Sequence, residues 1–378
     1  MIDDSVANMV AIVLTALFLG LLNSFQYAET QLPPGSLPQI QLPLNRTGSI
    51  TGEDGGSIVK PGTLITTALA PLSAWVSKLG KEHPLVGRVW SPSAQETVLP
   101  AEVVRAAMEA DVVLVGETHD NPDHHKLQAW LLRQLAAKGK RPAVVMEMIG
   151  ADKADDLANV QLASNVTTDA IGTKLDWESS GWPAFSIYRP IVDAALGNNL
   201  TLLAGDASKD QVRQVSQQGL GALAYSERVR LGIGSQLPAA LAVSLTDELK
   251  ASHCNQLADA DLAGMVQVQR FRDAALADNV LKAVDKASGN GVVLIAGGGH
   301  VRSDRGVPLY LRTRASGLKL LTIVFSEVIA GDDNPEDGAP HDANGKPAAD
   351  FVWYTARTER PDPCGELQKQ LQGKTSPG

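Results

Sequence analysis

The chain has 378 residues, with 33 basic and 42 acidic side chains and a net charge of −9. Its length exceeds one average domain and suits a large α/β domain with appendages. A chain this acidic and this poor in aromatic residues lacks the broad basic surface that nucleic-acid binding needs, so we expect no nucleic-acid partner.

An apolar stretch lies near the N-terminus, from Val6 to Leu22. It is at the short limit for a membrane-spanning helix and is long for the apolar region of a signal peptide. We therefore predict a signal peptide or membrane anchor over residues 1–28, and an exported protein that is periplasmic or membrane-anchored. The residues that follow are rich in Pro, Gly, Ser and Gln, which predicts a flexible linker over residues 29–63.

Five apolar runs in the rest of the chain predict short buried strands, each bounded by Gly or an acidic residue. They are Val112–Gly116, Ala143–Met148, Leu200–Gly205, Val292–Gly297 and Leu320–Phe325. Segments with helical spacing separate them. One begins at Asn121-Pro122, an N-cap followed by proline in the first turn, and two more run over Ser186–Leu196 and Leu262–Ala287. Strands alternating with helices predict an α/β fold with a mostly parallel sheet flanked by helices.

About 80 residues after the third predicted strand contain no convincing strand, which is too long for a single crossover. We predict an inserted smaller helical subdomain over residues 206–287, within a domain that spans residues 64–330. Residues 331–378 are expected to form a loop-rich C-terminal extension with one last short strand at Phe351–Ala356.

The two cysteines, Cys254 and Cys364, lie far apart in the chain. An even number of cysteines and an exported context favour a disulfide between them, and the alternative is two unpaired thiols. In the chain-entropy model, closing a loop of ~110 residues stabilises the fold by about 4–5 kcal/mol.

Acidic and imidazole side chains follow the predicted strands. They are Glu117, His119, Glu147, Asp206, His300 and Glu327. Ligands and catalytic groups gather at the carboxyl ends of parallel strands, and an unpaired buried carboxylate is costly. For each residue alone, a helix cap or a solvent-exposed group is an equally good interpretation. Taken together, they predict a site, and we give the name strand-end cluster to Glu117, His119, Glu147 and His300.

Three further features are less specific. His124 and His125 occupy the first turn of the helix after Asn121, where neighbouring side chains point about 100° apart, so at most one can face the cluster and a solvent-exposed turn is expected. An aromatic patch surrounds the start of the next helix and predicts either a pocket for a flat apolar ligand or a hydrophobic lid. The patch consists of Trp177, Trp182, Tyr188 and Arg189. His253 ends a helix, either as a ligand or as a surface residue beside the disulfide.

Several motifs follow one another in order between Leu85 and Ile329. They are Gly-Glu-x-His, Asp-Asn-Pro-x-His-His, Val-Val-x-Glu-Met, Tyr-Arg-Pro-Ile-Val, His-Cys, Gln-x-x-Arg-Asp-Ala-x-x-Ala, Val-Val-Leu-Ile-Ala-Gly-x-Gly-His and Arg-Gly-Val-Pro. This order resembles the ChaN-like haem-binding uptake family, which belongs to a wider group with Tiki proteases, TraB proteins and erythromycin esterases. The resemblance implies an α/β domain with a helical subdomain, export from a bacterial cell, haem binding and a homodimer, with membrane-bound transport components as further partners.

The resemblance leads to two hypotheses of function. The first is a haem-binding protein for iron uptake or storage, in which Tyr188 or a histidine ligates the iron; phenolate ligation suits ferric haem. The residues predicted to contact haem are Tyr188, Arg189, Trp177, Trp182, His253 and His300. The alternative is a metal-dependent hydrolase, in which the strand-end cluster binds a divalent metal ion or activates water, as the matching residues do in enzymes of the wider group. The resemblance favours haem binding.

Overall fold

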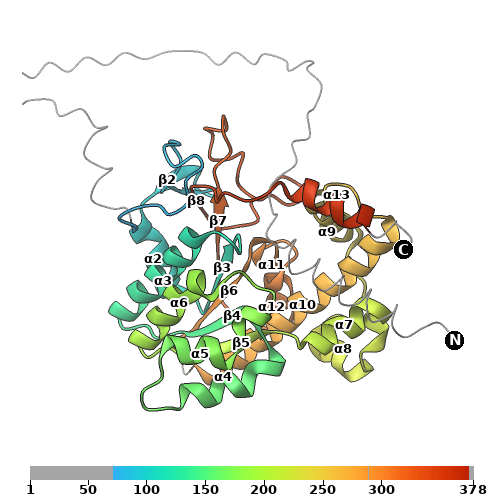
Figure 1. The fold of residues 1–378 in the computed structure, drawn as a ribbon, viewed down its shortest axis with the longest axis horizontal. Coiled ribbons are helices and arrows are strands. Elements are labelled where there is room, and N and C mark those ends of the chain that lie inside the picture. The colour runs from blue at the N-terminus through green and yellow to red at the C-terminus, as the bar shows by residue number, and fades with distance from the viewer. Residues whose placement is uncertain (1–70, 288, 374–378) are drawn as a thin grey trace, which may run out of the picture.

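The computed structural model describes residues 71–287 and 289–373, which form one sheet of eight strands flanked by helices (Figure 1). The strands are β1 (Val89–Ser91), β2 (Glu96–Val98), β3 (Val112–Glu117), β4 (Ala143–Gly150), β5 (Leu202–Asp206), β6 (Val292–Gly297), β7 (Leu320–Glu327) and β8 (Phe351–Thr355). Their order in the sheet is β2-β1-β8-β7-β3-β6-β4-β5. The six strands from β8 to β5 are parallel, and β1 is antiparallel to both of its neighbours. The predicted α/β fold class is confirmed.

All but the last of the helices precede or separate strands in sequence, and α13 follows the last strand. They are α2 (Pro100–Glu109), α3 (Pro122–Ala137), α4 (Ala154–Gln161), α5 (Thr168–Lys174), α6 (Phe185–Gly197), α7 (Lys209–Gln218), α8 (Tyr225–Leu231), α9 (Ala239–Ser252), α10 (Asp259–Lys286), α11 (Gly298–Val301), α12 (Val307–Arg314) and α13 (Pro363–Gly373). Helix α3 begins as predicted, because the Asn121 side chain accepts a hydrogen bond from the backbone N–H of Asp123 and Pro122 occupies the first turn.

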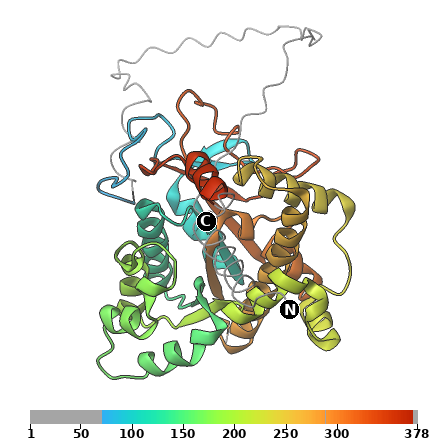
Figure 2. The same cartoon turned by 45° about the vertical axis from the view of Figure 1, so that its right-hand side comes forward.

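Alternate residues of the central strands supply two hydrophobic cores, one on each face of the sheet. Val113 and Val115 of β3 pack with α2, α3 and α6, whereas Val112 and Leu114 pack with α7, α10 and α12. Figure 2 shows α3–α6 on one side of the sheet and α7–α10 on the other. Because the residues on both faces of these strands are buried, each strand is a continuous apolar run and does not alternate apolar with polar residues.

Between β5 and β6 the described residues form helices joined by loops and no strand, as expected. The 28-residue α10 packs against β4, β5 and β6 and so covers the sheet itself, while α8 and α9 lie further out (Figure 1). Strand β8 pairs with both β7 and β1, which places part of the C-terminal segment inside the sheet. The division of the chain into a domain, a helical subdomain and an extension stays a prediction.

The predicted disulfide is present. Cys254, just after α9, is bonded to Cys364, at the start of α13, with a Cα–Cα distance of 5.6 Å. It ties the outer helices to the C-terminal helix.

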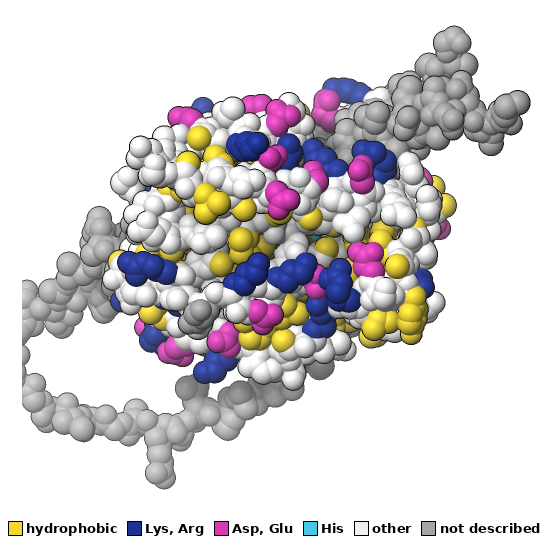
Figure 3. Space-filling view, turned by 90° about the horizontal axis from the view of Figure 1, so that it is seen from below, with side chains coloured by type: hydrophobic (Ala, Val, Ile, Leu, Met, Phe, Trp, Pro, Cys, Tyr) yellow, Lys and Arg dark blue, Asp and Glu magenta, His cyan; other side chains and the backbone are white. Residues whose placement is uncertain are grey.

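The segments predicted over residues 1–28 and 29–63 lie outside the described residues. Within the described part of the chain, no helix has the length and apolar character needed to cross a membrane. On the face seen in Figure 3, Lys and Arg side chains lie interspersed with Asp and Glu side chains.

Candidate functional site

The strand-end cluster comes together at the carboxyl edge of the sheet. Glu117 ends β3, Glu147 lies in β4, and His300 follows β6 in α11. The His119 imidazole lies 2.9 Å from the Glu117 carboxylate and 3.9 Å from that of Glu147, whose other oxygen lies 3.2 Å from His300. All four side chains are at most 1% exposed, so they form a buried network.

Glu117 is held by helices α3 and α6. Its carboxylate accepts hydrogen bonds from Tyr188 Oη (3.0 Å), Gln128 Nε2 (2.6 Å) and His119 Nδ1 (2.9 Å), and His125 Nδ1 lies 3.2 Å away. Burial acts to raise the pKa of Glu117, but the charge of His125 and these hydrogen bonds outweigh it and hold the pKa well below its usual range. Glu117 is therefore a carboxylate in the folded protein.

His125 is the cation that balances Glu117. Its Nε2 donates to the His119 carbonyl oxygen, and its Nδ1 lies 3.2 Å from acceptor oxygens of both Gln128 and Glu117. Both ring nitrogens therefore carry hydrogen. Burial acts to lower the pKa of His125, but the charge of Glu117 raises it above the ordinary value.

Glu147 is held in the same way on the other face of the sheet. One oxygen accepts from Arg272 Nη2 (2.7 Å) and the other from the Gly297 backbone N–H (2.7 Å). His300 bridges Glu147 to Asp273, whose carboxylate accepts from its Nδ1 at 2.6 Å. Burial acts to lower the pKa of His300, but the two carboxylates raise it to about 10, so His300 is an imidazolium.

His119 lies between the two carboxylates and has the fewest hydrogen bonds of the four side chains in the strand-end cluster. Nδ1 donates to Glu117, so in the neutral ring the lone pair is on Nε2. Nε2 is buried and has no hydrogen-bond partner among the described residues. Gly297 provides the room beside it, because a Cβ at that position would lie 2.8 Å from Nε2. The Trp182 ring packs on the imidazole, with centroids 4.8 Å apart.

The expectation of a solvent-exposed turn at His124 and His125 is wrong. Both rings are fully buried, because Asn121 and Pro122 start α3 directly against the end of β3. The two rings do point to different partners: His124 Nδ1 accepts from the Thr118 N–H and its Nε2 donates to the Thr355 hydroxyl. Burial lowers the pKa of His124 to about 3, so it is neutral.

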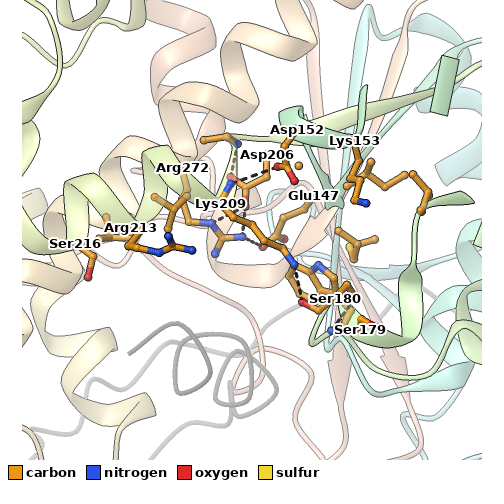
Figure 4. Close-up of a pocket in the computed structure, with 18 of the residues that line it drawn as sticks. Glu147, Asp152, Lys153, Ser179, Ser180, Asp206, Lys209, Arg213, Ser216 and Arg272 are labelled. Carbon is orange, nitrogen blue, oxygen red and sulfur yellow. Dashed lines mark hydrogen bonds and ion pairs between the residues drawn. The ribbon is translucent and has the colours of Figure 1, made fainter. Parts of the chain in front are cut away.

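A cavity of about 310 Å³ opens beside β4 and β5, and we call it the β4–β5 cavity (Figure 4). Its inner wall includes Glu147, Asp206 and Arg272, and Arg272 forms ion pairs with both carboxylates. Its apolar lining comes from Met148, Ile149, Leu175, Trp177, Trp182, Val212, Met265 and Val268. Lys153, Lys209 and Arg213 line it as well, together with Asp152, Asp176 and Asp261.

A second cavity of about 300 Å³ lies over β3, β6 and β7, and we call it the β7 cavity. Its lining includes Glu117, Gly298, Arg302, Glu327 and His341. The strand-end cluster thus has Glu147 in the wall of one cavity and Glu117 in the wall of the other, with His119 between them.

The family described as "Haem-binding uptake, Tiki superfamily, ChaN" matches residues 103–311, more than half of the chain. The chain belongs to this family. The chain is similar to the solved structure of ChaN of Campylobacter jejuni, which binds haem cofacially, at 18% identity and a TM-score of 0.53. The match covers 70% of this chain and 95% of that one. This likeness shows a shared fold.

Two other solved structures resemble the chain more weakly. The type III effector HopBA1 is 13% identical with a TM-score of 0.36, covering 68% of this chain and 92% of that one. A mutant of the erythromycin esterase EreC is 14% identical with a TM-score of 0.34, covering 63% and 77%. No curated protein matches the chain.

Of the residues predicted to contact haem in this ChaN-family protein, Trp177 and Trp182 line the β4–β5 cavity. Tyr188 is fully buried, and its hydroxyl lies 3.0 Å from the Glu117 carboxylate and 3.1 Å from the His119 carbonyl oxygen. Burial and the charge of Glu117 raise the pKa of Tyr188 well above its ordinary value. Its side chain is therefore a phenol that belongs to the buried network.

The remaining predicted contacts lie elsewhere. Arg189 pairs with Asp169 of α5, and its guanidinium lies 5.7 Å from the centre of the Phe185 ring. His253 is buried, not on the surface, with Nδ1 2.6 Å from the Leu249 carbonyl oxygen, and it lines neither cavity. His300 is enclosed by Asp273 and Glu147.

The predicted divalent-metal site is not supported. Among residues 71–287 and 289–373, no group of three or more His, Cys, Asp or Glu is placed to hold a metal ion. The carboxylates of the strand-end cluster are directed instead at protein donors such as Arg272 and Gln128.

Four site residues were not predicted from the strand ends: Gln128, Arg272, Asp273 and Tyr188 in its observed role beside Glu117. All four lie on helices: Gln128 on α3, Tyr188 on α6, and Arg272 and Asp273 on α10. The motif Gln-x-x-Arg-Asp carried the signal for Arg272 and Asp273, since an Arg-Asp pair in an otherwise buried helix requires charged partners.

Proposed function

We propose that this chain binds haem in the β4–β5 cavity and serves haem or iron uptake or storage. Membership of the haem-binding uptake family supports this, and the observation in the structure that carries it is the cavity lining. Trp182, Met148 and Met265 offer aromatic and thioether surface for a porphyrin face. Lys209 and Arg213 line the same cavity, and we assign them to pair with the haem propionates.

Haem, when bound, supplies a redox-active iron whose ligands come from the protein. The cavity suits the porphyrin, but the ligand proposed from the sequence does not suit the iron in this conformation. The Tyr188 hydroxyl donates to Glu117, and its raised pKa keeps it protonated. In this proposal Tyr188 positions Glu117 and the aromatic residues hold the porphyrin.

Export to the periplasm or attachment to a membrane belongs to the same proposal. The Cys254–Cys364 disulfide supports it, because such bonds persist in oxidising compartments. A homodimer and membrane-bound transport components are the partners we propose with it. Size-exclusion chromatography with light scattering, with and without hemin, tests the dimer.

A hemin titration of the purified protein, followed by the Soret band, tests haem binding. We expect saturable binding that weakens in Trp182→Ala and in Lys209→Glu, because the first removes porphyrin contact and the second reverses a charge beside the propionates. His341→Ala, in the β7 cavity, is the matched control and should bind like the wild type. A Soret change that does not saturate in the wild type would contradict the proposal.

A second candidate function is hydrolysis, and one observation favours it. The 3.9 Å gap between His119 Nε2 and Glu147 suits a bridging water, while Glu117 orients the ring so that Nε2 can accept a proton. Reporter-ester hydrolysis, measured with and without added divalent ions, tests this. We expect Glu117→Gln and His119→Ala to abolish it, and the double variant to be no worse, as for residues that act as a unit. Activity that survives in both single variants excludes this role.

A further inference from the structure

We propose that the β7 cavity is a second ligand site, which binds a monocarboxylic acid with an apolar body, and that the carboxylate of Glu248 on α9 takes the ligand's place in this structure. The cavity volume of about 300 Å³ is at the lower end of the range for small-molecule pockets, so the ligand is small. The β7 and β4–β5 cavities share no lining residue. The proposal is therefore independent of haem binding.

Part of the cavity wall is apolar and receives the body of the ligand. Leu85, Val324, Val328 and Tyr354 line the cavity and pack together in one hydrophobic cluster. Pro340, in the loop after β7, also lines it. An apolar wall with a small number of charged groups is typical of pockets for small organic molecules.

Two carboxylates among the lining residues are engaged by the protein itself. The Glu117 side chain is fully buried and is directed at donors such as Tyr188. The Glu327 side chain is 2% exposed, and its carboxylate accepts a hydrogen bond from Arg360 at 2.7 Å. Asp332 is partly exposed in the loop after β7, where solvent screens its charge. The charges that recognise a ligand therefore lie on α9 and in the segment after α11.

Arg302 and Arg305, which follow α11, place two positive charges in the cavity wall. Arg302 donates to the Asp304 carboxylate from Nε (3.0 Å) and from Nη2 (2.9 Å). Arg305 pairs with the Glu248 carboxylate and donates to the Ser244 hydroxyl, both on α9. Glu248 also lies 3.8 Å from Arg302 Nη1. Since the guanidinium fork matches a carboxylate, Glu248 occupies the position that a ligand carboxylate requires.

The exposed fractions of these side chains show which partner is able to leave. Arg302 and Arg305 are 9% and 3% exposed, whereas Glu248 is 23% exposed. A buried guanidinium without a partner is costly, but a partly exposed glutamate can turn into water. When Glu248 turns away, the two arginines face the single carboxylate of Asp304, which leaves one positive charge. A ligand with one carboxylate restores the balance.

Helix α9 itself is fixed, so the exchange involves the Glu248 side chain. One face of the helix lines the cavity, with residues at helical spacing: Ser244, Glu248, Ala251 and Ser252. Leu245 and Leu249 pack in a cluster with residues of α10. Just after the helix, the Cys254–Cys364 disulfide joins this segment to α13 (Figure 1). Rotation of one side chain is therefore enough to open the arginines to a ligand.

Isothermal titration calorimetry of the full chain with octanoate, 1-octanol and octylamine tests the head group, because the three probes share one alkyl chain and differ in charge. We expect saturable binding of octanoate at a single site. 1-Octanol should bind more weakly by roughly tenfold or more, since it makes no hydrogen bond between charged groups. Octylamine, a cation at neutral pH, should not bind, because its ammonium group would face two arginines.

Glu248→Gln gives the most specific readout. It should tighten octanoate binding by roughly tenfold or more, because the competing carboxylate is removed. Arg305→Gln should weaken octanoate binding by a similar factor. Its matched control is Arg141→Gln, since Arg141 is exposed and lines neither cavity. A glutamate that only shaped the cavity wall would not tighten binding when it is replaced.

Ala251→Phe tests the location of the site without changing a charge. Ala251 is half-buried on the face of α9 that lines the cavity, so a phenyl ring there should fill the cavity and abolish octanoate binding. Ala240→Phe, at an exposed position of the same helix, is the matched control and should bind like the wild type. Circular dichroism checks that each variant is folded. If Arg305→Gln does not fold, Glu248→Gln and Ala251→Phe carry the test.

Four outcomes would overturn the proposal. Equal affinity for octanoate and 1-octanol, or tighter binding of octylamine than of octanoate, would show that the arginines do not recognise the head group. Unchanged or weaker octanoate binding in Glu248→Gln would show that Glu248 does not hold the carboxylate position. Octanoate binding that survives in Ala251→Phe would place the probe outside the β7 cavity. The absence of octanoate binding in both the wild type and Glu248→Gln would exclude the site, and none of these results bears on hemin binding in the β4–β5 cavity.

Discussion

The buried imidazolium of His300 makes the stability of this fold depend on pH in a defined direction. Burial lowers the pKa of His300, but Glu147 and Asp273 outweigh burial and raise the pKa from 6.5 to about 10. Arg272, the other charged group at this point of α10, pairs with Glu147 and Asp206. Between pH 6.5 and about 10 the folded state therefore holds one proton that the unfolded state has lost.

The sign and the size of the effect follow from this difference. The stabilisation is fully present below pH 6.5 and is lost as the pH rises through about 10. Over that range the free energy of unfolding should fall by about 1.4 kcal/mol per pH unit on account of this group. The full shift corresponds to an upper bound of about 5 kcal/mol, a large fraction of the stability of a typical domain.

Urea unfolding followed by tryptophan fluorescence, at intervals from pH 6 to pH 10, measures this slope. His300→Gln is the control, because glutamine keeps a hydrogen-bond donor near Asp273 but cannot be protonated. Lysine and tyrosine side chains titrate alike in both proteins, so the difference between the two curves isolates His300. Parallel curves for the wild type and His300→Gln would refute the assignment of a buried imidazolium.

Three further predictions concern the fold. Thiol labelling of the unfolded, non-reduced protein should find no free thiol, and replacing Cys254 and Cys364 with serine should lower stability by about 4–5 kcal/mol in urea unfolding; two labelled thiols would contradict the disulfide. Gly116→Ala should lower the free energy of unfolding by about 1–3 kcal/mol through overpacking, because its Cβ would lie 2.5 Å from a neighbouring side chain. Gly264→Ala, at a position on α10 with open space around it, should raise the free energy of unfolding by about 0.5–1 kcal/mol. If the melting temperatures of the two variants shift in the same direction, the space around each glycine does not determine the effect on stability. A chain that begins at Thr63 should unfold cooperatively, because the strands all lie beyond it, and a broad transition in calorimetry would show that the preceding residues belong to the core.

The central strands were predictable because burial on both faces leaves a simple signature, an uninterrupted β-branched run. Val112–Gly116 and Val292–Gly297 became β3 and β6 almost residue for residue. The sequence did not predict strands β1 and β2, because each has only three residues, too few to show an apolar pattern, and because β2 is largely exposed. The strand-end cluster was predictable for the same reason as the strands, since parallel strands deliver their final residues to one edge.

The partners of the cluster were not predictable, because they come from helices whose rotation about their axes is set by packing. Asp273 faces His300 only because α10 lies across β4 and β5. Tyr188 illustrates the limit most clearly. Its aromatic neighbours indicated a ligand pocket, but α6 turns its hydroxyl inward to Glu117, away from the cavity that Trp177 and Trp182 line.

The two candidate functions make different demands on Glu147, which gives a last prediction. Hydrolysis requires its carboxylate to share a water with His119, whereas haem binding requires only that it shape the cavity wall. Glu147→Gln keeps the shape but leaves Arg272 and His300 without their common anion, so stability should fall by about 3–5 kcal/mol.

At a temperature where Glu147→Gln is folded, a haem-binding protein should keep its hemin spectrum and a hydrolase should lose ester hydrolysis. His300→Gln is the matched comparison, since it disturbs the same network one residue further from His119. Loss of hydrolysis in Glu147→Gln together with an altered hemin spectrum would mean that the carboxylate acts on both ligands. The assignment of Glu147 to the wall alone would then be wrong, because a side chain that only shapes a cavity does not alter the ligand field of a bound iron.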